Sequence, residues 1–360
     1  MSSMTRQILI GGVPVGGGAP VSVQSMTNTD TRDVAATVAQ IEALTEAGCN
    51  IVRSSVYDMA CAKALGQIKR RIRIPIVADI HFDYRLAIAA MENGADKLRF
   101  NPGNIGDESR VRAVVDCAKT HHTPIRIGVN AGSIEPSLRQ KYGGATTEAM
   151  IESALKHVSI LEREGFTDIV LSLKASNVRD TVDAYRAISK RVDYPLHVGI
   201  TETGDVVSGI IKSAAGIGAL LLDGIGDTIR VSLTDDPVRE VATGLKILRA
   251  VGLLRDDIEL VSCPTCGRTR VDVMHMVELV NSRLPHKKGY LKVAIMGCAV
   301  NGPGEARDAD IGVAFGDGNG ILFEKGEQVY HGAADDVVER LIARANEMLL
   351  LNQEDNREKS

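Results

Sequence analysis

The chain has 360 residues, and at about 150 residues per domain this length predicts two or three domains. Its 42 basic and 46 acidic residues give a net charge of −4, which excludes a strongly basic nucleic-acid binder. Apolar residues make up 44% and charged residues 24%, the usual balance of a globular chain with a sizeable core, so disorder and a collagen-like structure are excluded as well.

The cysteines and the apolar stretches indicate in which cellular compartment the protein is expected. Six cysteines in 360 residues do not form the dense disulfide framework of a small secreted protein, so we expect a reducing cytoplasm. Residues 8–23 could pass for the core of a signal peptide, but five glycines and two prolines would not sustain the helix that such a core needs. We expect a turn before the first strand there. No other stretch approaches the about 18–20 apolar residues of a membrane span.

From residue 20 to about residue 250, short β-branched runs alternate with stretches of helical spacing. The spacing from Val34 to Leu44 predicts a helix that ends at Gly48, with Asp30 or Thr31 as its cap. A second clear helix is predicted from Thr146 to Glu164. The β-branched runs begin at Val21, Asn50, Ile74, Asp96, Pro124, Asp168, Pro195 and Thr228.

Eight strands, each followed by a helix, are the count of a closed (β/α)8 TIM barrel, and we predict this α/β fold for residues 1–256. An open doubly wound sheet is the rival fold, but no glycine-rich dinucleotide-binding turn follows the first strand. Gly216 and Gly218 resemble half of such a turn, yet they precede an apolar run, 219–224, that we interpret as a strand. The pattern leaves open whether LLLD (220–223) or TIRVSL (228–233) is the eighth barrel strand.

The pattern changes after about Asp257. A helical stretch at 271–284, a strand at 292–297 and a hairpin around the glycine-rich turn 316–320 predict a second, smaller α+β domain over residues 257–360. A final amphipathic helix is expected over 337–350, followed by a polar, frayed tail.

In a TIM barrel the chemistry takes place at the carboxyl ends of the strands, and in this chain those positions are polar and basic. They are Arg53, Asp79, His81, Arg99, Asn101, Arg126, Asn130, Ser172, Lys174, His197, Glu202, Arg230 and Ser232. Five of the eight strands place an arginine or a lysine near the mouth, although the total charge is negative. Converging guanidinium groups repel one another unless an anion neutralises them, and arginine matches phosphate through two parallel hydrogen bonds.

Any single one of these basic residues could be a salt-bridged residue of the barrel rim. Their repetition at successive strand ends instead favours a small substrate that carries a diphosphate, with Asp79 and Asp96 as structural partners of the arginines. The loop from Asn101 to Gly106 enters a helix and can aim backbone N–H groups at a phosphate.

The sharpest motif is a group of three cysteines in the second domain. Cys263 and Cys266 form a C-x-x-C pair, and Cys298 follows in the segment GCAVNGPGE. Zinc would need a fourth Cys or His, and no histidine stands beside Cys298 in the sequence. Glu305 follows Cys298 through a glycine-rich turn, and three thiolates with a different fourth ligand suit a [4Fe–4S] cluster with one exchangeable iron. A structural zinc site and a redox C-x-x-C without metal are the alternatives.

Taken together, these motifs resemble those of bacterial 4-hydroxy-3-methylbut-2-enyl diphosphate synthases, the iron–sulfur enzyme family of the methylerythritol phosphate route to isoprenoids. The resemblance covers almost the whole chain, with Phe100 and the pair Ser54-Ser55 as mild departures. The motifs that carry it are ADIHFDYRLA (78–87), DKLRFNPGNIG (96–106), RIGVNAGS (126–133), SLKAS (172–176), LHVGITE (196–202), GIGDTIRVSLT (224–234), SCPTCGRT (262–269) and MGCAVNGPGEA (296–306).

The resemblance implies a barrel joined to a cluster domain like those of sulfite and nitrite reductases, with Cys263, Cys266, Cys298 and Glu305 as the cluster ligands. It implies an oxidoreductase acting on CH or CH2 groups. The substrate would be 2-C-methyl-D-erythritol 2,4-cyclodiphosphate, reduced by two electrons with ring opening and loss of water. Members of the family are homodimers in which the barrel mouth of one subunit meets the cluster domain of the other, and flavodoxin or ferredoxin would donate the electrons.

The residues expected to hold the substrate are Arg53, His81, Arg99, Asn101, Arg126, Asn130, Lys174, His197, Arg230 and Ser232. Glu202 is the candidate proton donor, with pairing to an arginine as its alternative role. A pterin-binding barrel methyltransferase with a structural metal site is the rival enzyme class, but it leaves the cysteine motif unexplained. A zinc ribbon that recruits nucleic acid is the rival binding module, and the weak basic balance and an aromatic content of 3% count against it.

Overall fold

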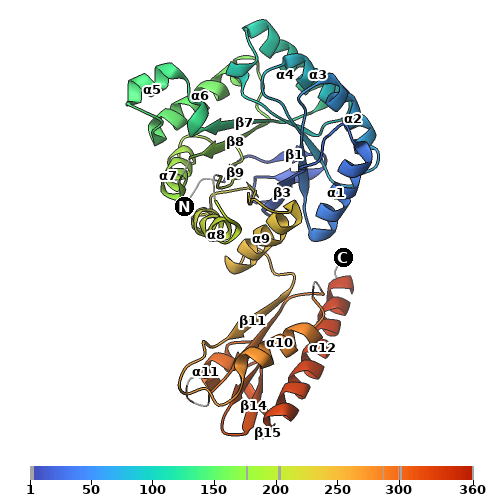
Figure 1. Cartoon of the computed structure of the whole chain (residues 1–360), viewed down its shortest axis with the longest axis vertical. Helices are drawn as coiled ribbons and strands as arrows, with labels where there is room; N and C mark the ends of the chain where they lie inside the picture. The colour runs from blue at the N-terminus through green and yellow to red at the C-terminus, as the bar shows by residue number, and fades with distance from the viewer. Residues whose placement is uncertain are drawn as a thin grey trace. The chain divides into compact units, whose positions relative to one another are not determined.

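The computed structural model describes residues 4–175, 177–201, 204–286, 288–298, 300 and 302–358. The chain divides into two compact units, 1–254 and 255–360, where the sequence predicts a boundary after residue 256 (Figure 1). The assignment of substrate binding to the first unit and of a cluster to the second stays a prediction.

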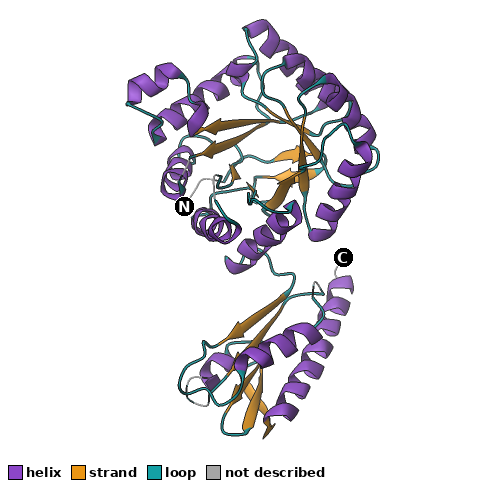
Figure 2. Ribbon diagram, in the orientation of Figure 1, coloured by secondary structure: helices purple, strands orange, loops and turns teal. Residues whose placement is uncertain are grey.

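The first unit is a parallel barrel surrounded by helices (Figure 2). Its strands are β3 (Ser22–Met26), β4 (Ile51–Ser55), β5 (Ile76–Asp79), β6 (Lys97–Arg99), β7 (Ile125–Asn130), β8 (Ile169–Lys174), β9 (His197–Val198) and β10 (Thr228–Ile229). They pair in the order β8-β7-β6-β5-β4-β3-β10-β9, and a parallel bridge between Leu171 and Leu196 joins the two ends. The predicted TIM barrel is confirmed, and each of the eight predicted runs contains one barrel strand.

Helices follow the strands along the chain and bury their apolar faces against the barrel. They are α1 (Val34–Ala47), α2 (Met59–Lys69), α3 (Tyr84–Glu92), α4 (Glu108–His121), α5 (Pro136–Tyr142), α6 (Thr147–Arg163), α7 (Val178–Ile188), α8 (Val206–Leu222) and α9 (Pro237–Ala250), with short 3-10 turns η1 (Pro102–Asn104) and η2 (Ala131–Ser133). Asp33 caps α1 by accepting a hydrogen bond from the N–H of Ala36, so the predicted caps Asp30 and Thr31 are wrong. The helix ends, as predicted, at Gly48, whose φ of 103° suits a residue without a side chain.

The apolar run 219–224 is not a strand, and that interpretation was wrong. Most of it forms the last turn of α8, and Thr228–Ile229 supplies the eighth barrel strand by pairing with both β3 and β9. A short apolar run cannot be told from a buried helix end by periodicity alone. Gly216 lies on the buried face of α8, where a Cβ atom would stand 2.6 Å from Cδ1 of Ile200.

An N-terminal hairpin closes the bottom of the barrel. Its antiparallel strands are β1 (Ile8–Ile10) and β2 (Val13–Val15). They pack with Ile51, Val77 and Val170, which lie at or near the amino ends of their strands. The glycine-rich stretch 8–23 therefore forms a hairpin where a plain turn was expected. Among the described residues, no helix combines the length and the apolar character that a membrane crossing requires.

The second unit is a five-stranded sheet with helices. Its strands are β11 (Ile258–Ser262), β12 (Leu291–Met296), β13 (Ile311–Phe315), β14 (Asn319–Glu324) and β15 (Glu327–Ala333), paired in that order. The first three run parallel and the last three form antiparallel pairs. Its helices are α10 (Val273–Arg283), α11 (Gly302–Arg307) and α12 (Ala334–Glu358).

The predicted helix at 271–284, the strand at 292–297 and the hairpin around 316–320 are all present. The last helix is longer than predicted, because α12 continues to Glu358 through the tail that we expected to fray. Val337, Leu341 and Ala345 anchor this helix in the core of the unit, together with Leu349 one turn further on. Burial of that apolar face supports the polar end of the helix.

Candidate active site

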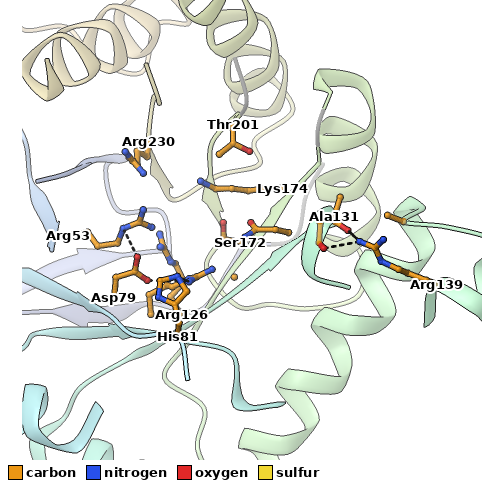
Figure 3. A pocket seen from close by; sticks show the side chains of 15 residues that line it. Arg53, Asp79, His81, Arg126, Ala131, Arg139, Ser172, Lys174, Thr201 and Arg230 are labelled. Atoms are coloured by element: carbon orange, nitrogen blue, oxygen red, sulfur yellow. Dashed lines mark hydrogen bonds and ion pairs between the residues drawn. The ribbon is translucent and has the colours of Figure 1, made fainter. Parts of the chain in front are cut away.

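A cavity of about 670 Å³ opens at the carboxyl ends of the barrel strands (Figure 3). Its position follows from the fold, because parallel strands deliver their last residues and the following loops to the same end of the barrel. The lining residues are Arg53, Asp79, His81, Arg99, Arg126, Gly128, Asn130, Ala131, Gly132, Arg139, Ala145, Ser172, Lys174, Thr201 and Arg230.

Among the described residues, the lining carries a large excess of positive charge: six cationic side chains and one carboxylate, that of Asp79. Asp79 lies 3.7 Å from Nε of Arg53 and 3.3 Å from Nη1 of Arg99. Arg230 is held from behind by Glu240 of α9, at 3.4 Å from its Nη2. Two carboxylates therefore form ion pairs with three of the arginines. No ion pair among the described residues joins a carboxylate to the other cationic side chains of the lining, which are Arg126, Arg139 and Lys174.

The electrostatics of the cavity reflect this imbalance. Burial raises the pKa of Asp79, but the guanidinium groups of Arg53, Arg99 and Arg126 together hold it below its ordinary value, so the carboxylate is ionised. Burial, only partly offset by Asp79, lowers the pKa of Arg53 to about 10, with Arg230 and Arg99 adding repulsion. Burial, followed by repulsion from Arg230 and Arg53, holds the pKa of Lys174 well below its ordinary value.

Arg126 shows the imbalance most clearly. It is only 1% exposed, and its Nε and Nη1 atoms have no hydrogen-bond partner among the described residues. Burial, followed by repulsion from Arg53 and Arg99, holds its pKa well below the ordinary value. Because buried polar groups in folded proteins are normally hydrogen-bonded, these donors are matched to a ligand that brings acceptors and negative charge.

The structure places most of the predicted substrate-binding residues in the lining. These are Arg53, His81, Arg99, Arg126, Asn130, Lys174 and Arg230. His81 lies at the rim, with Nε2 at 3.2 Å from Nη1 of Arg99.

The remaining predicted residues lie elsewhere. Asn101 is buried and exchanges two hydrogen bonds of 2.9 Å with the backbone of Gly128, which fixes the loop after β6 against β7. His197 is buried inside the barrel with Nδ1 against Oγ1 of Thr228. Ser232 follows β10 and is not part of the lining. Glu202 lies outside the described residues.

Sequence reasoning missed Arg139 and Thr201 of the lining. Arg139 comes from α5, beyond the strand end, and its Nη2 donates 2.9 Å hydrogen bonds to the carbonyl oxygens of Ala131 and Gly132 (Figure 3). It thereby holds the η2 turn that follows Asn130. No strand-end position marks such a residue, so its role follows only from the helix packing.

In the second unit, the cysteines gather at one edge of the sheet. Cys263 follows β11 and Cys298 follows β12, and these two strands are parallel neighbours. The N–H of Gly297 donates to the sulfur of Cys263 at 3.2 Å. Cys266 is exposed, and its N–H donates to Oγ1 of Thr269 at 3.1 Å.

Helix α11 starts at the same edge of the sheet, with Glu305 in its first turn. Its first residue, Gly302, packs so closely that a Cβ atom would stand 2.9 Å from Cβ of Met296 and 3.1 Å from that of Ala314. Among the described residues, no three His, Cys, Asp or Glu side chains converge closely enough to hold a single metal ion.

The fold and the cavity define a TIM-barrel enzyme with a strongly basic mouth and an additional α+β domain. Residues 5–245 match the family model described as the GcpE TIM-barrel domain, and residues 259–347 match the GcpE protein C-terminal domain. The chain belongs to the GcpE family, so the resemblance stated from the motifs is confirmed.

Curated relatives cover nearly the whole chain. The 4-hydroxy-3-methylbut-2-en-1-yl diphosphate synthase (flavodoxin) of Caldanaerobacter subterraneus subsp. tengcongensis is 57% identical over 349 residues, 97% of this chain and 98% of that protein. The protein of the same name from Geobacter sulfurreducens is 58% identical over 349 residues, 97% of this chain and 99% of that one.

A solved structure, dihydropteroate synthase from Stenotrophomonas maltophilia, matches with a TM-score of 0.51 at 17% identity, over 69% of this chain and 98% of that one. At this identity the match shows the barrel fold alone. The alternative of a pterin-binding methyltransferase is not supported.

Proposed function

We propose that this chain reduces 2-C-methyl-D-erythritol 2,4-cyclodiphosphate to 4-hydroxy-3-methylbut-2-enyl diphosphate, with ring opening and loss of water. The observation that carries the proposal is the cavity in which, for the part of the chain that the structure describes, six cationic side chains face one carboxylate. A cyclic diphosphate supplies the missing negative charge and the acceptors for the buried donors of Arg126. The curated relatives at 57% and 58% identity are named for the same product.

In this proposal some residues of the cavity bind the diphosphate directly and others hold the binding residues in place. Arg126 and Lys174 contribute donors that form no ion pair with a described carboxylate, whereas Arg53 and Arg99 are held in place by Asp79. Arg139 orders the η2 turn that directly follows Asn130, the last residue of β7. Glu202 stays the candidate proton donor.

The second unit would hold a [4Fe–4S] cluster through Cys263, Cys266, Cys298 and Glu305. The donor set fits, because three cysteine sulfurs and the carboxyl group of Glu305 share one sheet edge and a backbone N–H donates to the sulfur of Cys263. A four-iron cluster binds each ligand to a different iron, so its ligands need not converge on one point as they would around zinc. The chemistry that a bound cluster supplies is electron transfer to the substrate.

We further propose that the chain works as a homodimer with an active site shared between subunits, and that flavodoxin or ferredoxin donates the electrons in a reducing cytoplasm. Helix α8 supports the dimer, because Val207 and Ile211, one turn apart, are 66% and 62% exposed. The adjoining groove between α8 and α9 is lined by further apolar residues, among them Ile210 and Ile247. Exposed apolar patches of this kind mark surfaces that associate.

Assays of iron and acid-labile sulfide after anaerobic purification test the cluster. About four of each per chain are expected, as a [4Fe–4S] cluster requires, and Cys263→Ser should lose most of both. Cys117→Ser is the matched control, because this half-buried thiol lies on α4 of the barrel and should leave the iron content unchanged. One zinc per chain without sulfide would contradict the proposal.

A further inference from the structure

The barrel closes where β8 meets β9, and we call the contact between these two strands the β8–β9 seam. The hydrogen bonding across this seam changes along its length. At the bottom of this seam, the N–H of Leu171 donates to the carbonyl oxygen of Pro195 at 2.9 Å, which is an ordinary rung between parallel strands. Parallel ladders repeat every second residue. The next rung toward the mouth should therefore run from the N–H of Leu173 to the carbonyl oxygen of His197.

A tyrosine hydroxyl occupies the position of that rung. Oη of Tyr185 accepts a hydrogen bond from the N–H of Leu173 at 3.1 Å and donates to the carbonyl oxygen of His197. Tyr185 is fully buried, and burial raises its pKa, so the hydroxyl keeps the proton that it donates. The two strands are thus bridged by a side chain where they would otherwise bond directly.

Helix α7 also takes the N–H of Ala175, the residue directly after β8. The N–H of Ala175 donates to Oγ1 of Thr181 at 3.2 Å, and Thr181 is as completely buried as Tyr185. The two residues are four positions apart on α7, which places them on one face of the helix. Two hydroxyls of α7 therefore replace β9 as the partner of β8 at the mouth of the barrel.

Lys174 lies between the two residues whose N–H groups are diverted. A Cβ atom on Gly199, just beyond β9, would stand 3.8 Å from Nζ of Lys174 and 2.6 Å from the carbonyl oxygen of Arg230. The Lys174 amine thus lies on the mouth side of the β8–β9 seam, next to Gly199, where a larger residue would collide with the backbone of Arg230. Figure 3 shows Lys174 extending into the cavity toward Arg230.

We propose that Tyr185, supported by Thr181, is a positioning residue for Lys174: its hydroxyl sets the separation of β8 and β9 and so places the amine in the anion cavity. The inference rests on the proposed function, since the anion is taken to be the diphosphate of the substrate.

Tyr185→Phe removes the hydroxyl and keeps the ring. On anaerobically purified protein, we expect inorganic pyrophosphate to bind about tenfold more weakly, as partial loss of one charge-assisted hydrogen bond implies, and KM for the cyclic diphosphate to rise while kcat changes little. Tyr194→Phe is the matched control, because Tyr194 is also buried and its hydroxyl donates to Glu162 at 2.7 Å, away from the cavity lining. Thr181→Val serves as a second, gentler variant with a smaller effect in the same direction.

A double-mutant cycle separates positioning from general damage to the fold. In a Lys174→Met background, Tyr185→Phe should change pyrophosphate binding less than about twofold, because the amine that it positions is already absent. An equal effect in both backgrounds would overturn the inference, as would wild-type binding by both Tyr185→Phe and Thr181→Val. Failure of the wild-type protein itself to bind pyrophosphate would overturn the proposed function and the inference with it.

Discussion

The backbone N–H of Gly297 donates to the sulfur of Cys263 at 3.2 Å. This bond joins the segment after β12 to the segment after β11. The carbonyl oxygen of Gly297 in turn accepts from the N–H of Arg270 at 2.9 Å, so the backbone of this one residue holds the loop of the C-x-x-C pair at both of its ends. Gly297 therefore fixes how the loop that carries Cys263 and Cys266 lies beside Cys298.

Gly297→Ala should disturb that arrangement without unfolding the sheet. A Cβ atom would stand 2.5 Å from Cγ2 of Val273 and 3.0 Å from Cγ2 of Thr269, so the loop must move. We expect most of the iron to be lost while the circular dichroism spectrum stays that of the parent. Gly267→Ala is the control, because a Cβ atom there meets nothing within 4 Å. Full iron content in Gly297→Ala would show that the loop does not set the ligand geometry.

Arg126→Met should weaken substrate binding without lowering the thermal stability of the protein. Substrate affinity should fall by about 1.5–3 kcal/mol, the worth of a hydrogen bond to a charged group. Thermal stability of the ligand-free protein should stay equal or rise, because the change removes a buried cation whose Nε and Nη1 lack partners among the described residues. Titration calorimetry and thermal unfolding measure the two effects. Unchanged affinity would remove Arg126 from the substrate site.

Diphosphate binding should take up protons through Lys174. Burial and the neighbouring arginines lower the pKa of its amine in the empty cavity, and a bound anion raises that pKa again. At a pH between these two pKa values the Lys174 amine is neutral in the empty cavity and charged in the bound one, so binding takes up a proton. Affinity therefore falls as the pH rises through the pKa of the bound form. Calorimetry with pyrophosphate in two buffers of different ionisation enthalpy measures the uptake. Lys174→Met should abolish it, and equal uptake in that variant would contradict the assignment.

Glu305→Cys should keep the iron and lose most turnover. In the proposed cluster site, a carboxylate would be a weaker ligand than a thiolate, so Glu305 would give way more readily than a cysteine at the same position. Glu305→Ala should also lose turnover, with a cluster that is more sensitive to oxygen. Iron assays and anaerobic kinetics measure both variants. Near-normal turnover in a fully loaded Glu305→Cys protein would remove Glu305 from the mechanism.

The parts of this molecule that follow strand ends could be predicted from the sequence. Arg53, Arg99 and Arg126 lie in the cavity because a parallel barrel brings every strand end to one mouth, and this rule needs no knowledge of packing. The eighth strand was left open because an apolar run at the end of α8 has the composition of a strand.

Contributions from helices could not be predicted. Arg139 reaches the lining from α5, and the hydroxyls of Thr181 and Tyr185 enter the β8–β9 seam from α7. Their positions depend on how each helix packs against the barrel. Periodicity predicts which face of a helix is buried, but it does not predict which backbone group a buried hydroxyl will meet.

The central claim is that the chain reduces the cyclic diphosphate, and anaerobic turnover tests it most directly. Protein with about four iron and four sulfide per chain, as the cluster requires, is supplied with 2-C-methyl-D-erythritol 2,4-cyclodiphosphate and a chemical reductant. We expect 4-hydroxy-3-methylbut-2-enyl diphosphate as the product, with two electrons consumed for each molecule formed. Absence of this product from fully loaded protein that binds the substrate would contradict the claim.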